Sequence, residues 1–208
     1  IVPKDTKANP EITLKVAKEL RDSGIQIVIG PIFNKNLTYL DELDKIIFLS
    51  LSNKVLKIPS NVISAGINAE SQVNTIKKFQ KEFNIERTIF LIPQTDYKPE
   101  IENAIKKTKI KLKEKFVYDT DPTKLTSQIE NLTRYSQRKQ NLLDEIKRVE
   151  NSDDPNKEKK IDNLKKKDTL GGINFDSVII ADFDESLKSV ATSLLYTDIS
   201  ATRISYIG

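Results

Sequence analysis

Residues 5–31 read DTKANPEITLKVAKELRDSGIQIVIGP. Asn9 and Pro10 predict the start of a helix, because an Asn side chain caps free N–H groups and proline fits the first helical position. Apolar residues then recur every four positions, and Gly24 is placed to end the helix in a left-handed conformation. A short, β-branched apolar run at 25–29 follows, which is typical of an interior strand covered on both faces. The stretch therefore predicts a βαβ unit.

The same alternation of helices and strands continues along the rest of the chain. Alternating helices and buried strands imply parallel sheets with right-handed crossovers, so we expect an α/β fold in which helices flank parallel sheets. The patterns predict helices at 37–43, 69–83, 99–109, 124–149 and 185–196, and strands at 46–51, 62–64, 88–92, 113–118, 177–181 and 204–207.

A long helical stretch interrupts the alternation in the second half of the chain. The helical pattern that ends near Val149 is broken at 151–156, and a second, lysine-rich helix follows and stops before Gly171. No strand separates the two helices. We therefore expect an insertion over about 137–171, in the form of a helical hairpin.

Length and composition indicate a globular protein made of two lobes. The chain has 208 residues, of which 38% are hydrophobic and 31% charged, as in proteins that fold in water. We expect a first lobe at 1–83 and a second lobe at 84–208 that carries the insertion. Both ends fall on strand-like residues, so we interpret the chain as a fragment of a longer protein. No apolar run approaches the roughly 18 to 20 residues that cross a bilayer.

The composition excludes several kinds of chemistry. Cysteine and histidine are both absent, which removes disulfides, thiol nucleophiles, zinc-thiolate sites and the usual general base near neutral pH. Neither glycine-rich phosphate-binding motif occurs, and the net charge of +4 comes from lysines interleaved with acids, unlike a nucleic-acid binder. We therefore predict no enzyme, no catalytic residue, no cofactor, no metal site and no nucleic-acid partner.

Three charged clusters admit a second interpretation. The carboxylates Asp119 and Asp121, and likewise Asp182, Asp184 and Glu185, have the residue types of an acid–base pair or a hard-metal site. Turn formation and helix capping explain them more simply, and we favour that interpretation. The lysine run at 157–167 has the charge to attract an acidic partner or an anionic membrane, although a solvated helix face is the commoner outcome.

Candidate binding residues follow from the sheet topology. In open parallel α/β sheets, ligands bind beyond the carboxyl ends of the strands, so the loops after the strands are informative. Small polar side chains and a few aromatic rings occur there. The predicted ligand-binding residues are Phe33, Asn34, Ser50, Ser52, Asn53, Asp96, Tyr97, Asp182 and Phe183.

Several motifs resemble a known fold. The segments DTKANPE at 5–11, IGP at 29–31 and FLSLSN at 48–53, at these spacings, resemble the first lobe of the type I periplasmic-binding-protein fold of amino-acid receptors. The strand at 88–92 followed by Asp96-Tyr97 resembles the entry to the second lobe. This resemblance implies a two-lobed clamshell and places the receptor pocket at Phe33, Asn34, Ser52, Asn53 and Tyr97.

Two further features are similar to one branch of that family. The charged helical insertion before FDSVIIAD at 175–182, and the ending ATRISYIG at 201–208, are similar to penicillin-binding-protein activators, envelope lipoproteins of Gram-negative bacteria that stimulate peptidoglycan synthases. This implies a periplasmic location, anchored to the outer membrane by a lipid outside the fragment, and a cell-wall synthase or other envelope protein as partner. The alternative is an ABC-transporter receptor for an amino acid or a similar small molecule.

Two positions depart from the receptor pattern. Receptors usually have a small or hydroxyl residue where Phe33 stands, and a glycine where Lys98 follows Tyr97. A bulky Phe33 would fill a cleft, which favours a protein-binding scaffold over a receptor.

Overall fold

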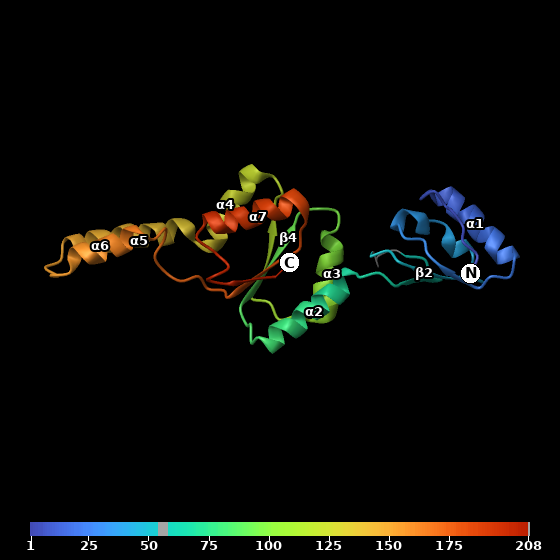
Figure 1. The fold of residues 1–208 in the computed structure, drawn as a ribbon, viewed down its shortest axis with the longest axis horizontal. Coiled ribbons are helices and arrows are strands. Elements are labelled where there is room, and N and C mark those ends of the chain that lie inside the picture. Colours follow the sequence, from blue (N-terminus) through green and yellow to red (C-terminus); the bar gives the residue numbers. More distant parts are fainter. Residues whose placement is uncertain (54–57, 208) are drawn as a thin grey trace. The chain divides into compact units, whose positions relative to one another are not determined.

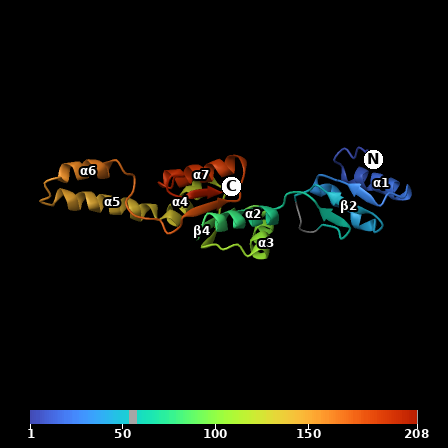
Figure 2. The same ribbon diagram turned by 60° about the horizontal axis from the view of Figure 1, so that its bottom comes forward.

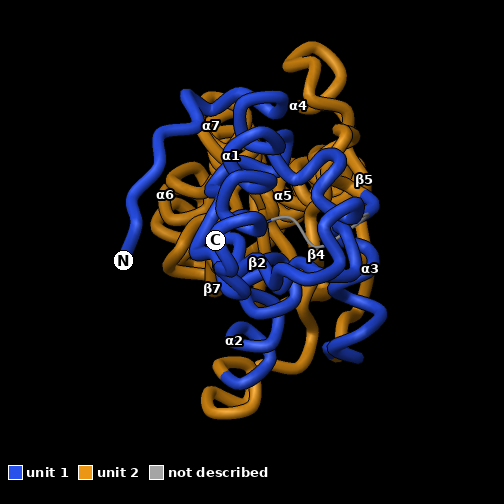
Figure 3. Tube along the Cα trace, turned by 90° about the vertical axis from the view of Figure 1, so that its right-hand side faces the viewer, with its two compact units in different colours: residues 1–78, 99–110 blue, residues 79–98, 111–208 orange. Residues whose placement is uncertain are grey.

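The computed structural model describes residues 1–53 and 58–207, drawn as a ribbon in Figure 1. Gly208, the last residue of the C-terminal motif, lies outside the described residues. The chain divides into two compact units, coloured separately in Figure 3. Unit 1 comprises 1–78 and 99–110, and unit 2 comprises 79–98 and 111–208. The predicted lobe boundary at residue 83 stays a prediction.

The first helix, α1 (Pro10–Asp22), has the predicted bounds and the predicted cap. The side-chain oxygen of Asn9 accepts hydrogen bonds from the backbone N–H groups of Glu11 and Ile12, at 2.8 and 3.1 Å. Gly24, just past the helix, has a φ of 78°. These local signals specify the helix because each satisfies backbone groups that the helix ends leave free.

Unit 1 contains a parallel sheet of three strands in the order β1-β2-β3. The strands are β1 (Ile27–Ile29), β2 (Ile47–Ser50) and β3 (Val62–Ser64). The helix predicted at 37–43 is wrong, since two short 3-10 turns, η1 (Asn34–Leu37) and η2 (Leu40–Glu42), take its place. Tyr39 lies between them with a φ of 68°, a left-handed conformation that no α-helix contains.

The prediction that β1 is an interior strand is also wrong. β1 stands at the end of the strand order, and its Ile27 and Ile29 side chains are 62% and 77% exposed. Val28 points to the opposite face and packs on the core of unit 1. The described residues therefore cover only one face of this sheet. That covered core consists of Ala17, Leu37, Leu40, Leu43, Ile46, Phe48 and Val62.

Unit 2 contains a second parallel sheet, with the strand order β5-β4-β6-β7. The strands are β4 (Thr88–Pro93), β5 (Glu114–Tyr118), β6 (Ser177–Ile180) and β7 (Ser205–Ile207). Every residue of β4 and β6 is buried, as expected for central strands. The helices α4 (Pro122–Thr133) and α7 (Asp184–Tyr196) lie together over one face of this sheet in Figure 1, and contribute Leu125, Ile129, Val190 and Leu194 to its core.

Two helices cross the boundaries between the units. They are α2 (Ala69–Glu82) and α3 (Lys98–Thr108), each of which contributes residues to both units. Within unit 1, the Lys107 ammonium lies 3.1 Å from the Glu70 carboxylate, and the Lys77 ammonium donates to the carbonyl of Thr108.

The continuous helix predicted at 124–149 is two helices, α4 and α5 (Tyr135–Glu150). Arg134 separates them with a φ of 52°, and its N–H bonds back to the last carbonyls of α4. After a turn, α6 (Lys157–Lys165) returns along α5, and Figure 2 shows the two helices side by side as the predicted hairpin. α6 buries no residue.

A buried guanidinium holds the base of this hairpin. Arg138 of α5 is 2% exposed, and its Nε donates to the carbonyl of Thr133 at 2.9 Å. One terminal nitrogen donates to the hydroxyl of Thr169 at 2.9 Å and the other to the carbonyl of Thr197. Burial lowers the pKa of Arg138 from its ordinary value. The hairpin is thus tied to the end of α7 by charge-assisted hydrogen bonds.

Candidate functional site

The carboxyl ends of three neighbouring strands gather polar and aromatic side chains in unit 2. Tyr97 lies in the turn after β4, Tyr118 is the last residue of β5, and Asp182 follows β6 by two residues. Because β4 pairs with both β5 and β6 in parallel, these three ends meet at the same edge of the sheet. Tyr97 and Asp182, two of the predicted ligand-binding residues, are therefore brought together, and their role in binding stays a prediction.

Asp182 accepts four hydrogen bonds from this cluster. Its Oδ1 accepts from the hydroxyl of Tyr97 and from the backbone N–H of Phe183, both at 2.9 Å. Its Oδ2 accepts from the hydroxyls of Tyr118 and Ser186, the latter at 2.5 Å. An ionised carboxylate has about four acceptor positions. The side chain is therefore fully engaged within the chain.

The two tyrosines are hydrogen-bond donors over the whole neutral range of pH. Burial, together with the hydrogen bond to Asp182, raises the pKa of Tyr97 to about 12. The same causes, with burial the larger, raise the pKa of Tyr118 well above its ordinary value. Both hydroxyls keep their protons because burial, and after it the neighbouring Asp182, disfavours the ionised phenolate.

An exposed aromatic surface adjoins the carboxylate. The ring of Phe183 lies 5.5 Å from the ring of Tyr97, with the two planes tilted by 33°, and Phe183 is 59% exposed. Asp96, in the same turn as Tyr97, is exposed to solvent. This edge of unit 2 thus offers an aromatic pair, the exposed carboxylate of Asp96 and the half-buried carboxylate of Asp182.

The other predicted site residues lie in unit 1. Phe33 is exposed and directly precedes Asn34, the first residue of η1, and Asn53 is exposed beyond β2. Ser50 is fully buried, where its hydroxyl donates to the carbonyl of Pro31 and accepts from the N–H of Ser52. The two buried serines therefore hold the loop after β1 against the end of β2. Their predicted role in ligand binding stays a prediction.

Sequence reasoning missed two members of the unit 2 cluster, Tyr118 and Ser186. Tyr118 is the last residue of the strand predicted at 113–118, and it is 1% exposed. Ser186 stands four residues after Asp182, the spacing at which residues near a helix start face each other. That spacing was the one signal in the sequence for this contact.

The described residues contain no group of three acidic, histidine or cysteine side chains that could hold a metal ion. Asp121 caps α4 by accepting from the N–H of Thr123 at 3.0 Å, which confirms the capping interpretation there. Asp119 pairs with Lys124 at 2.8 Å, and this contact lowers the pKa of Asp119. The expected cap by Asp184 is wrong, because this residue is the first of α7 and Phe183 occupies the cap position. No helix in the described ranges is both long and apolar enough to cross a membrane.

Comparisons with known proteins identify the fold through solved structures. No family model and no curated protein matches the chain. An ABC-transporter substrate-binding protein from Desulfitobacterium hafniense is 15% identical, with a TM-score of 0.59, over 99% of this chain and 53% of that one. The C-domain of LpoA from Haemophilus influenzae, a regulator of PBP1A, is 13% identical, with a TM-score of 0.57, over 98% of this chain and 52% of that one.

A third similar structure is a branched-chain amino-acid transporter's periplasmic ligand-binding protein from Burkholderia xenovorans. It is 10% identical, with a TM-score of 0.58, over 98% of this chain and 48% of that one. The chain therefore spans about half the length of the solved structures that it matches. Its two parallel α/β units and these neighbours together show that the chain has the type I periplasmic-binding-protein fold.

Proposed function

We propose that this chain belongs to a non-catalytic envelope binding protein that regulates a cell-wall synthase. The observation that carries the proposal is the full engagement of Asp182. An amino-acid ligand presents an ammonium group, which needs acceptors with free lone pairs. Asp182 already accepts four hydrogen bonds from its own chain, so it serves to hold β4, β5 and α7 in place.

Exposed aromatic rings support a protein partner. Phe183 in unit 2 and Phe33 in unit 1 are 59% and 54% exposed, and both follow strand ends. Aromatic residues are enriched in the cores of protein interfaces, where they bury a large area at a low cost in conformational entropy. The resemblance to LpoA, itself a regulator of PBP1A, supports a synthase as that partner. A periplasmic or outer-membrane location, with a lipid anchor outside residues 1–208, belongs to the same proposal.

The hairpin gives such a partner a second surface. α5 and α6 extend from a base fixed by Arg138, and α6 exposes most of its length, including Lys157, Lys159 and Lys160. A hairpin whose base is rigid loses little conformational entropy when it binds.

A solute-binding receptor is the second candidate. Asp96 favours it, because this carboxylate is exposed in the same turn as Tyr97 and is of the type that an ammonium ligand requires. In this case the protein would deliver an amino acid or a similar small molecule to a transporter by closing two lobes over the cleft.

Calorimetry of the full-length protein distinguishes the two candidates. The regulator proposal predicts no binding from a panel of the common amino acids and measurable binding of a purified cell-wall synthase. Replacing residues 144–164 by a short Gly-Ser linker keeps Arg138 and its partners and should weaken synthase binding about tenfold, as loss of about 1.4 kcal/mol requires. Micromolar binding of an amino acid, abolished in Tyr97→Ala, would sink the regulator proposal in favour of the receptor.

A further inference from the structure

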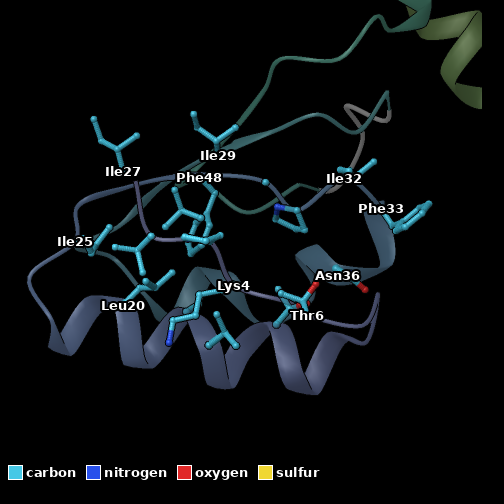
Figure 4. Close-up of a pocket in the computed structure, with 18 of the residues that line it drawn as sticks. Lys4, Thr6, Leu20, Ile25, Ile27, Ile29, Ile32, Phe33, Asn36 and Phe48 are labelled. Atoms are coloured by element: carbon cyan, nitrogen blue, oxygen red, sulfur yellow. The ribbon is translucent and has the colours of Figure 1, made fainter.

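Exposed apolar side chains occur in both units, but on different kinds of surface. In unit 1, Ile27 and Ile29 point away from α1, on the face of the sheet that the described residues leave uncovered (Figure 4). In unit 2, exposed rings stand on α5 and α7, two helices whose other sides carry the buried residues Leu142 and Leu194. The unit 2 rings are therefore not required by a core that lacks cover.

Two tyrosines and a leucine form the apolar part of this unit 2 surface. The ring centroids of Tyr135 and Tyr196 lie 5.4 Å apart, with the two planes tilted by 46°. Tyr196 is 55% exposed, and Leu143 is 47% exposed. Residues four apart lie on the same side of a helix, so Tyr135, Lys139 and Leu143 form one row along α5. We call Tyr135, Lys139, Leu143 and Tyr196 the hairpin-base surface.

The charge on the hairpin-base surface is positive. The Lys139 ammonium lies 5.7 Å from the centroid of the Tyr135 ring. Neither Lys139 nor Arg134, the exposed residue before Tyr135, forms an ion pair with any described residue. A carboxylate brought beside Lys139 by a partner would meet an ammonium that has no other counter-charge. Complementary charges of this kind speed association and select partners, so the surface fits an acidic partner.

A buried guanidinium holds the two helices of this surface together. Arg138 of α5 donates to the carbonyl of Thr197, the residue that follows Tyr196. Its Nε donates to the carbonyl of Thr133, at the end of α4. The backbones that carry the two rings are therefore fixed before any partner arrives, which lowers the entropic cost of binding.

The composition of the surface favours a protein over a lipid membrane. Tyrosine is enriched at protein interfaces, and it is common among the residues that contribute most to binding. The hydroxyls of Tyr135 and Tyr196 have no hydrogen-bond partner among the described residues, so both are available to a partner. Anionic membranes are bound instead by clusters of roughly four to eight Lys or Arg. The row along α5 has one lysine.

We propose that a protein partner docks on the hairpin-base surface through an apolar segment that places a carboxylate opposite Lys139. This inference rests on the proposed function, in which the partner is a cell-wall synthase, and gives that contact a definite place in unit 2. All four residues of the surface remain when a linker replaces residues 144–164. The contribution of this surface is therefore separate from that of the outer hairpin.

Calorimetry of the full-length protein with a purified cell-wall synthase tests the proposal. Tyr196→Ala should weaken binding at least about thirtyfold, as expected for an aromatic residue at the centre of an interface. Lys139→Gln should weaken binding about threefold at low salt and not at high salt, because salt screens the attraction that it removes. Tyr39→Ala, at a tyrosine of the same 55% exposure in unit 1, is the matched control and should leave the affinity unchanged.

Urea denaturation of each variant shows whether its fold is intact. If Tyr196→Ala fails to fold, Leu143→Ala on the same surface replaces it, with an expected loss of about tenfold in affinity. Unchanged synthase binding by the folded variant would overturn docking at this surface and leave the proposed function standing. No synthase binding by the unmodified protein would overturn both.

Two further results would assign the surface to a different occupant, and each would overturn the proposal. The first is a dimer, seen by analytical ultracentrifugation, that Tyr196→Ala dissociates while synthase binding persists. The second is binding to phosphatidylglycerol vesicles that Tyr196→Ala abolishes and Tyr39→Ala retains, again with synthase binding intact.

Discussion

The strands β1 and β4 have nearly the same sequence character and opposite environments. Both consist mainly of apolar residues, yet all six residues of β4 are buried whereas Ile27 and Ile29 of β1 are largely exposed. The difference lies in what surrounds each strand: β4 has a strand on both sides, and β1 has a neighbour on one. An apolar run in the sequence therefore does not by itself tell whether a strand has a neighbour on both sides.

The largest loss of stability should come from a substitution in the core of the unit 2 sheet. Leu91→Ala removes a fully buried side chain from β4 and should lower the free energy of unfolding by about 2–5 kcal/mol, through lost burial and a residual cavity. Urea denaturation of the 208-residue chain measures it. The matched variant Ile29→Ala should change stability by less than about 0.5 kcal/mol. Equal losses would remove the distinction between β1 and β4.

The next largest loss of stability should come from removing a buried polar side chain of unit 2. Arg138→Ala leaves the carbonyls of Thr133 and Thr197 without a donor, and should cost about 2–4 kcal/mol. Arg148→Ala, at an exposed pair with Glu145, should cost less than about 0.5 kcal/mol. If both variants unfold at the same urea concentration, the base of the hairpin is not held by this guanidinium.

Smaller losses of stability are expected for polar residues at the strand ends, which can be compared between the two sheets. Asp182→Asn removes the charge and places an amide donor among the hydroxyl donors of Tyr97, Tyr118 and Ser186, and should cost about 1–3 kcal/mol. Ser50→Ala in unit 1 removes one neutral hydroxyl and should cost about 1 kcal/mol. Thermal unfolding of both variants ranks the two clusters, and a larger loss at Ser50 would contradict the central role of Asp182.

The smallest expected effect is a dependence of stability on alkaline pH that comes from Tyr97 in unit 2. Tyr97 has a pKa near 12 in the folded chain and the ordinary value of 10.0 when unfolded. The folded state therefore holds its proton more tightly, so this contribution is complete below pH 10 and is lost as the pH rises toward 12. Unfolding free energies measured from pH 9 to 12 should fall less steeply in Tyr97→Phe. Tyr39, exposed in unit 1, is the control position for the same substitution.

Local signals made much of the fold predictable. The cap at Asn9, the left-handed Gly24 and the apolar spacing between them depend on near neighbours in the chain, and α1 has the predicted bounds. The left-handed residues Tyr39 and Arg134 were missed, because neither residue type favours that conformation and tertiary packing imposes it.

The candidate site, too, could be predicted only where local sequence determines it. Asp182 and Tyr97 were predicted because each follows a strand, whereas the part played by Tyr118 depends on a hydrogen bond to a residue 64 positions away. That contact exists only through the strand order β5-β4-β6, which periodicity does not contain.

The four hydrogen bonds to Asp182 also bear on how unit 2 assembles. They join the turn after β4, the end of β5 and the start of α7 through one carboxylate. A slip of β5 by one residue would turn Tyr118 to the opposite face of the sheet and leave Asp182 short of a donor. Forms of the sheet with β5 in the wrong register would therefore lose a hydrogen bond at Asp182. This carboxylate thus helps to select the native alignment of the strands during folding.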